Sequence, residues 1–252
     1  MIPGTNSTTG ADGRKGSRRA FTLVELLLVI IIIGVLAAIT IPSIHKAQLN
    51  AMRSASLMVV NQIDSACQSY ATDFNGAYPP SVSGDYPNWF GGQLLPLFLT
   101  GYAGDGGSDG APSGTLYNDD GAEGFGFRTV KRGPVRGPYR GTEALKTAKF
   151  PDGTDTDPPS YVMFIDAFEY PILYYRYDQA NSTYQRDHNY KNLSSPDRRY
   201  GPTDVANYAK AGTGKFLRKD FLLISKGPDG TWGAASAEVL RSDDITNFLQ
   251  EY

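Results

Sequence analysis

The chain of 252 residues contains one cysteine, Cys67, and two histidines, His45 and His188. A single cysteine excludes an intrachain disulfide, and Cys67 lies in a helical pattern where a buried apolar role is expected. Neither histidine belongs to a metal-ligand or nucleophile pattern. Phosphate-loop and Cys-x-x-Cys patterns are also missing. The sequence therefore predicts that the protein is not an enzyme.

The chain also lacks an excess of positive charge, since its formal net charge is −2. No basic stripe with interleaved aromatic residues is present, so nucleic-acid binding is not expected. Residues 1–20 carry four basic residues and one acidic residue, and their removal changes the net charge from −2 to −5. A basic segment before an apolar run favours a cytoplasmic N-terminus and an exported C-terminal part.

The most informative feature is a long apolar run from Phe21 to Ile41. Its 21 residues would rise about 31 Å as a helix, which matches the hydrocarbon core of a bilayer. One carboxylate, Glu25, lies near its start. A charge within a membrane segment costs about 2.5–3.5 kcal/mol on insertion scales. We therefore expect a partner that neutralises Glu25.

The string Phe21-Thr-Leu-Val-Glu25 closely resembles the processing and assembly segment of type IV pilins and pseudopilins. In that family a leader is cut off just before a Phe, and the fifth residue of the mature chain is Glu. The resemblance implies that residues 1–20 are a leader, that prepilin peptidase cuts between Ala20 and Phe21, and that the new amine of Phe21 is methylated. The residue before the cut is usually Gly in the family and is Ala20 here.

The N-terminal segment has three alternative interpretations. A secretory signal peptide cut near Ala37–Ala38 would have a shorter apolar region. A twin-arginine signal matches Ser17-Arg18-Arg19-Ala20-Phe21 and would export a folded soluble protein. A plain single-pass anchor would not explain the Phe-Thr-Leu-Val-Glu string. Glu25 and the length of the run favour the pilin-like interpretation over the first two.

An amphipathic helix is predicted to follow the membrane segment, over residues 42–74. Pro42 closes the apolar run and would bend or loosen a helix. Apolar residues then recur at spacings of three and four, which indicates one helix face: Ile44, Ala47, Ala51, Ala55, Met58, Val59, Ile63, Ala66, Tyr70 and Phe74. The helix should stop before Asn75-Gly76, where residues tolerate a positive φ.

Residues 75–252 are predicted to form one exported α+β domain. The junction from Tyr70 to Pro79 is similar to that of the G-type pseudopilin of type II secretion, in which a Gly-x-Tyr-Pro turn leaves the helix. Leu94–Leu99 predicts a short apolar helix. The runs Ile172–Tyr177 and Asp220–Ser225 predict strands. The expected fold is a long N-terminal helix packed on a small antiparallel sheet.

Two polar insertions, residues 100–160 and 178–215, predict long loops. The first contains a basic stretch, Arg128–Arg140, for which a solvated loop is expected and contact with an acidic partner is the alternative. Between the insertions, Asp166 to Pro171 resembles the family segment Asp-Pro-Trp-Gly-x-Pro. Ala167 and Glu169 depart from that pattern.

The C-terminal part resembles the ending of the G-type pseudopilin, which encloses a bound calcium ion. The resemblance implies that Asp229, Asp243 and Asp244 supply carboxylates to Ca²⁺, which prefers six to eight oxygen ligands. The alternative is structural. Asp229 would then form an ordinary turn, and Asp243-Asp244 would cap a terminal helix of Ile245–Glu251.

The resemblance implies a structural subunit of the pseudopilus of a type II secretion system in the bacterial inner membrane. It would polymerise through its N-terminal helices, with Glu25 pairing the N-terminal amine of a neighbouring copy. The implied partners are further copies of the chain, minor pseudopilins, prepilin peptidase and an inner-membrane assembly platform. A type IV pilus subunit or minor pilin is the alternative, and a twin-arginine-exported binding protein is the alternative of another class.

Overall fold

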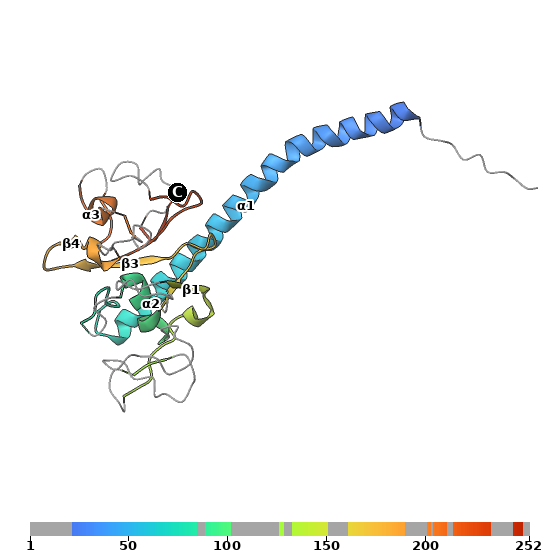
Figure 1. The fold of residues 1–252 in the computed structure, drawn as a ribbon. Helices are drawn as coiled ribbons and strands as arrows, with labels where there is room; N and C mark the ends of the chain where they lie inside the picture. The colour runs from blue at the N-terminus through green and yellow to red at the C-terminus, as the bar shows by residue number, and fades with distance from the viewer. Residues whose placement is uncertain are drawn as a thin grey trace, which may run out of the picture. The chain divides into compact units, whose positions relative to one another are not determined.

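The computed structural model describes residues 22–84, 89–101, 126–128, 133–150, 161–189, 201–202, 204–210, 214–232 and 244–248. The chain divides into two compact units, Met1–Ala47 and Gln48–Tyr252, which are described separately below. Helix α1 (Leu23–Asp73) contributes to both units (Figure 1). Helices and antiparallel strands together give the α+β fold that the sequence predicts.

In the first unit, α1 remains helical through Pro42. Proline has no backbone N–H, so the carbonyl of Ala38 loses its usual helical partner. The hydroxyl groups near this point bond to other carbonyls of the helix: Thr40 Oγ1 donates to Leu36 O at 2.8 Å and Ser43 Oγ to Ile39 O at 3.2 Å. The apolar run and the residues after it are thus one helical element.

In the second unit, α1 buries a stripe with helical spacing on the rest of the domain: Ser56, Val60, Ile63, Ala66, Cys67, Tyr70 and Ala71. The predicted stripe was wrong at Met58, which is 72% exposed. The buried stripe shares Ile63, Ala66 and Tyr70 with the predicted one, and it also includes the polar Ser56. Its Oγ accepts a hydrogen bond from the N–H of Ala167 at 3.0 Å.

The helix ends at Asp73, as predicted. Asn75 and Gly76 follow with φ values of +53° and +85°, which are typical of the left-handed residues that end helices. Helix α2 (Gly91–Thr100) also lies where the sequence predicts a short apolar helix, and it is buried along its whole length. Its C-cap, Gly101, has φ +81°.

The main sheet has four strands in the order β4-β3-β5-β6. Strands β3 (Leu173–Asp178) and β5 (Phe221–Ser225) pair antiparallel, which confirms the predicted pair. Strand β4 (Thr183–Tyr184) lies beside β3, and β6 (Ile245–Thr246) beside β5. The alternative of a terminal helix is wrong for Ile245–Thr246, because these residues form a strand.

Both faces of this sheet are buried. Tyr174, Phe221 and Leu223 join the core that contains α1 and α2. Their neighbours along the strands belong to a second core, with Tyr175 and Leu222 among its members. Strand side chains alternate between faces, so a continuous apolar run such as Phe221–Ile224 indicates a strand covered on both sides.

The prediction of long loops in both insertions was wrong for several described segments. Residues 100–160 contain the 3₁₀ turn η1 (Thr142–Ala144) and strand β1 (Thr147–Phe150), which pairs with β2 (Tyr161–Phe164). Residues 178–215 contain β4, the 3₁₀ turn η2 (Arg186–His188) and helix α3 (Val205–Tyr208). These elements are too short for their apolar residues to show a helical or strand period. Even so, α3 covers the face of the main sheet that carries Tyr175 and Leu222.

The basic stretch Arg128–Arg140 is not a solvated loop in its described part. Arg136 forms a 2.8 Å ion pair with Asp73 at the end of α1, and the Tyr139 hydroxyl donates to the same carboxylate at 2.9 Å. Arg140 Nε donates to Ser69 Oγ at 2.7 Å. Asp73 is therefore the acidic group that this stretch contacts, and it belongs to the same chain.

The side chain of Asp166 holds the turn from Asp166 to Pro171. Asp166 Oδ1 accepts the N–H groups of Phe168 and Tyr170, both at 2.9 Å. Glu169 in this turn has φ +69°. A left-handed conformation is one that glycine adopts without strain, so Glu169 occupies a position that favours glycine.

Candidate functional site

The first turn of α1 places Glu25 against Thr22. Thr22 donates its backbone N–H and its hydroxyl to Glu25 Oε2, each at 3.1 Å, and Thr22 Oγ1 accepts the N–H of Glu25 at 3.2 Å. This is a capping box, in which side chains satisfy N–H groups that have no partner inside the helix. A carboxylate in the first turn also interacts favourably with the helix dipole.

Reasoning from the sequence missed the role of Thr22, although a signal for it was present. Thr-x-x-Glu immediately before an apolar run is the sequence pattern of a capping box. Within the described residues both bonds to the carboxylate end on Oε2, which leaves Oε1 there to accept a donor from another molecule. The predicted cleavage residues, Ala20 and Phe21, lie outside the described residues.

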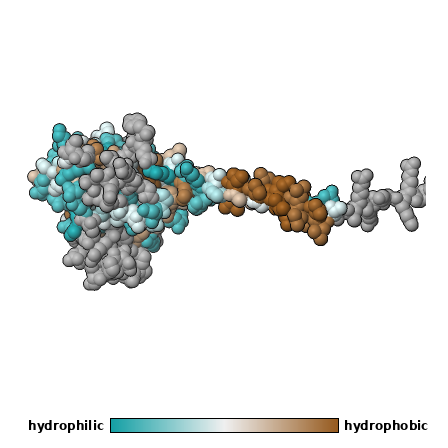
Figure 2. All heavy atoms as spheres, turned by 90° about the horizontal axis from the view of Figure 1, so that it is seen from above, coloured by the Kyte–Doolittle hydropathy of each residue, from teal (hydrophilic) through white to brown (hydrophobic). Residues whose placement is uncertain are grey.

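Apolar side chains surround the first part of α1 (Figure 2). The large apolar residues from Leu23 to Ile44 are 47–80% exposed. Helix α1 contains a window long and apolar enough to cross a membrane. A helix that is apolar on all sides needs an apolar environment, which agrees with membrane anchoring of this segment.

Two of the three predicted calcium ligands, Asp229 and Asp244, belong to the described residues. Asp229 is exposed and accepts the Thr231 N–H at 2.8 Å and its hydroxyl at 2.7 Å. Asp244 is buried and accepts the Tyr208 hydroxyl at 2.6 Å, while Asp243 lies outside the described residues. The described part of the chain contains no group of three His, Cys, Asp or Glu side chains that could hold a metal ion. Calcium binding therefore stays a prediction.

The surroundings of Cys67 and His188 indicate structural rather than chemical roles. Cys67 is a free, buried cysteine, and burial raises the pKa of its thiol well above the ordinary value. A neutral thiol is a poor nucleophile and metal ligand. His188 Nδ1 lies 2.8 Å from Ser81 Oγ. Neither residue belongs to a metal cluster in the described part of the chain.

A polar cluster ties the outer half of α1 to the C-terminal strands. Arg218 Nη1 donates to Asp64 Oδ1 and Arg218 Nε to Asp220 Oδ1, both at 2.6 Å. Asn247 Nδ2 donates to the same Asp64 oxygen at 2.8 Å, and Asn247 Oδ1 accepts the Leu223 N–H at 2.9 Å. The cluster therefore holds the C-terminal strands of the second unit on α1.

The prokaryotic N-terminal methylation motif matches residues 15–41 of this chain. The N-terminal segment of the chain thus carries a prepilin-type methylation motif. Two curated relatives carry the name type II secretion system core protein G. That of Pectobacterium carotovorum subsp. carotovorum is 36% identical over 73 residues, which are 29% of this chain and 46% of the relative. That of Klebsiella michiganensis is 34% identical over 71 residues, which are 28% and 49% of the two chains.

The chain thus spans about half the length of the curated relatives that it matches. No solved structure is significantly similar to it. The matched motif contains Thr22 and Glu25, so the capping box lies inside it. The second unit lies outside the residues that the motif matches.

Proposed function

We propose that the protein is a structural subunit of the pseudopilus of a type II secretion system. It is held in the bacterial inner membrane by the apolar part of α1, with its N-terminus in the cytoplasm and its C-terminal unit in the periplasm. The basic residues before the apolar run support this orientation. Prepilin peptidase cuts between Ala20 and Phe21, and the new amine is methylated.

The observation that carries the proposal is the Thr22–Glu25 capping box at the start of an otherwise apolar helix. It explains how a lone carboxylate is tolerated there before assembly, because two donors of the same chain stabilise it. Cleavage would create an amine at Phe21 with a typical pKa of about 7.7–8.0, which is positive at neutral pH. This cation is the complement that the membrane segment otherwise lacks.

In the filament, the amine of an incoming subunit pairs with Glu25 of a subunit already in place. Either charge alone is costly in an apolar environment, whereas together they neutralise each other. Glu25 Oε1 supplies the acceptor while Oε2 keeps its bonds to Thr22. The pair sets the axial register of the packed helices. Further copies, minor pseudopilins and the inner-membrane assembly platform are the partners of this process.

The test uses Glu25→Gln and Glu25→Val in a strain that lacks the wild-type subunit. Glutamine keeps an oxygen acceptor for Thr22 but removes the charge, whereas valine removes both. We expect both variants to insert, to be cleaved after Ala20 as N-terminal sequencing would show, and to form no filaments by electron microscopy. Ordinary filaments from Glu25→Gln would rule out the charge pair, and a mature start near Ile39 would rule out the pilin-like processing.

A further inference from the structure

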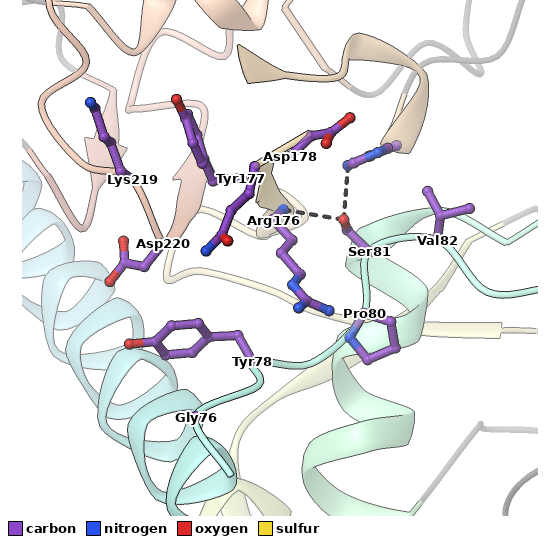
Figure 3. A pocket seen from close by; sticks show the side chains of 12 residues that line it. Gly76, Tyr78, Pro80, Ser81, Val82, Arg176, Tyr177, Asp178, Lys219 and Asp220 are labelled. Atoms are coloured by element: carbon purple, nitrogen blue, oxygen red, sulfur yellow. Dashed lines mark hydrogen bonds between the residues drawn. The ribbon is translucent and has the colours of Figure 1, made fainter. Parts of the chain in front are cut away.

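A polar cleft of about 390 Å³ opens in the second unit. It lies where the chain leaves α1, beside the end of β3 and the residues just before β5 (Figure 3). Its volume falls within the range of about 300–1,000 Å³ that is typical of ligand sites. No part of the proposed filament function requires it.

The walls of the cleft are held by hydrogen bonds between segments that are distant in sequence. The buried hydroxyl of Tyr174 donates to Pro79 O at 2.6 Å. Ser81 Oγ accepts the N–H of Arg176 at 3.2 Å and lies 2.8 Å from His188 Nδ1. The cleft is thus formed before any ligand arrives, which reduces the entropic cost of binding.

The two carboxylates of the cleft are already engaged. Asp178 accepts the N–H groups of Ala180 and Asn181 and the side-chain amides of Asn181 and Gln185. The bond from the Asn181 side chain is the largest cause that lowers the pKa of Asp178 to about 2. Asp220 accepts from Arg218 Nε and from the N–H of Phe221.

The two cations of the cleft have no such partners. In the described part of the chain, neither the Arg176 guanidinium nor the Lys219 ammonium makes a hydrogen bond or an ion pair. Figure 3 shows the Arg176 side chain extending from β3 toward Pro80, across from the ring of Tyr78. The cleft therefore offers a ligand these two cations and an apolar wall, next to two carboxylates that keep their negative charge but whose oxygens already accept hydrogen bonds.

We propose that this cleft binds an acidic peptide segment of a partner protein, with Arg176 as the donor to a carboxylate. A guanidinium presents a planar fork of N–H groups that matches both oxygens of a carboxylate. Tyr78 and Pro80 pack against the aliphatic stem that carries the carboxylate, which a simple inorganic anion lacks. Lys219, exposed at the rim, attracts the acidic segment from solution.

The experiment measures binding of a fluorescein-labelled peptide, acetyl-Gly-Asp-Glu-Asp-Gly, to the full chain in non-ionic detergent by fluorescence anisotropy. Its Asn-Gln-Asn counterpart is the ligand control. We expect Arg176→Gln to weaken binding about 10- to 100-fold, as the loss of a hydrogen bond to a charged group predicts. Arg176→Lys should restore part of the affinity, because it keeps the charge without the fork.

Arg186→Gln is the matched control, because it removes the same charge from an exposed residue outside the cleft. It should leave the affinity within about twofold of the wild type. Equal weakening by Arg176→Gln and Arg186→Gln, or equal binding of the Asn-Gln-Asn peptide, would overturn the proposal. Competition by inorganic phosphate at the same concentration as the acidic peptide would show a general anion site and would also overturn it. Circular dichroism confirms that each variant is folded, and Lys219→Gln provides a second, milder test.

Discussion

Replacing Arg218 with methionine should destabilise the second unit more than any other single charge removal described here. Arg218 donates to Asp64 on α1 and to Asp220 before β5, both at 2.6 Å, and its guanidinium lies 4.4 Å from the centre of the Phe221 ring. Methionine keeps an unbranched apolar stem but leaves two carboxylates without their cation. Their side chains are only 23% and 22% exposed.

The magnitude follows from this partial burial. Breaking a fully buried ion pair costs about 3–5 kcal/mol, whereas exposed pairs contribute about 0.2–1 kcal/mol. With about a fifth of each side chain exposed, we expect a loss of about 2–4 kcal/mol. For a domain of 150–250 residues this lowers the melting temperature by about 5–15 °C.

The assay is thermal unfolding of the full chain in non-ionic detergent, followed by the tertiary signal in near-ultraviolet circular dichroism. Arg186→Met is the matched control, because Arg186 is 46% exposed and lies 3.8 Å from Asp187. It should change stability by less than about 0.5 kcal/mol. An Arg218→Met protein that melts within 2 °C of the wild type would refute the reasoning. A double-mutant cycle with Asp64→Asn should give a coupling of about 0.5–3 kcal/mol.

Three further predictions concern calcium, pH and one glycine. If calcium binds the folded state, EGTA should lower the melting temperature and Asp229→Ala should abolish the difference. Calcium at one hundred times its Kd would stabilise the fold by about 2.7 kcal/mol. No shift with EGTA would favour the structural role of these aspartates. Hydrogen bonds from Arg136 and then from Tyr139 hold the pKa of Asp73 below its ordinary value. The contribution of Asp73 to stability is therefore complete above the unfolded pKa of about 3.9 and is lost as the pH falls through the lower folded pKa. Melting temperatures measured from pH 5 to pH 3 should then fall more steeply for the wild type than for Asp73→Asn. Parallel curves would contradict this. In urea unfolding, Gly101→Ala should lower the free energy of unfolding more than Gly76→Ala does. Both glycines have positive φ, which alone costs about 1–2 kcal/mol for alanine, but a Cβ at Gly101 would also clash with Gly126 O, whereas the space around Gly76 is open. Equal losses would show that the contact with Gly126 relaxes.

The sequence was sufficient to predict the long helix, its end and the central strand pair. These features depend on local signals: an apolar run, the Asn75-Gly76 stop, and the apolar strands that became β3 and β5. The buried stripe of α1 was predicted less well, because the choice between Met58 and Val60 is made by the domain that packs on the helix. Periodicity alone does not contain that information.

The polar contacts of the second unit were not predictable from local patterns. The Asp73–Arg136 pair joins residues on α1 and in a region expected to be a solvated loop. The cleft around Arg176 is formed by four segments that are separated in sequence. In contrast, the capping box of Thr22 and Glu25 lies within four residues, so a local pattern contains it. Whether Asp229, Asp243 and Asp244 meet depends on residues outside the described part of the chain.

The cluster around Arg218 also has a consequence for the order in which the protein folds. Asn247 contacts Asp64 across 183 positions of the chain, and β6, which contains Ile245, completes the sheet beside β5. Contacts of such sequence separation form late, because a long loop must close first. A chain synthesised from its N-terminus therefore presents α1 with an unfilled partner position until Asn247 has been made. Truncation before Ile245 would leave the carboxylate of Asp64 without Asn247, so the fold of the second unit depends on a segment that is made long after α1.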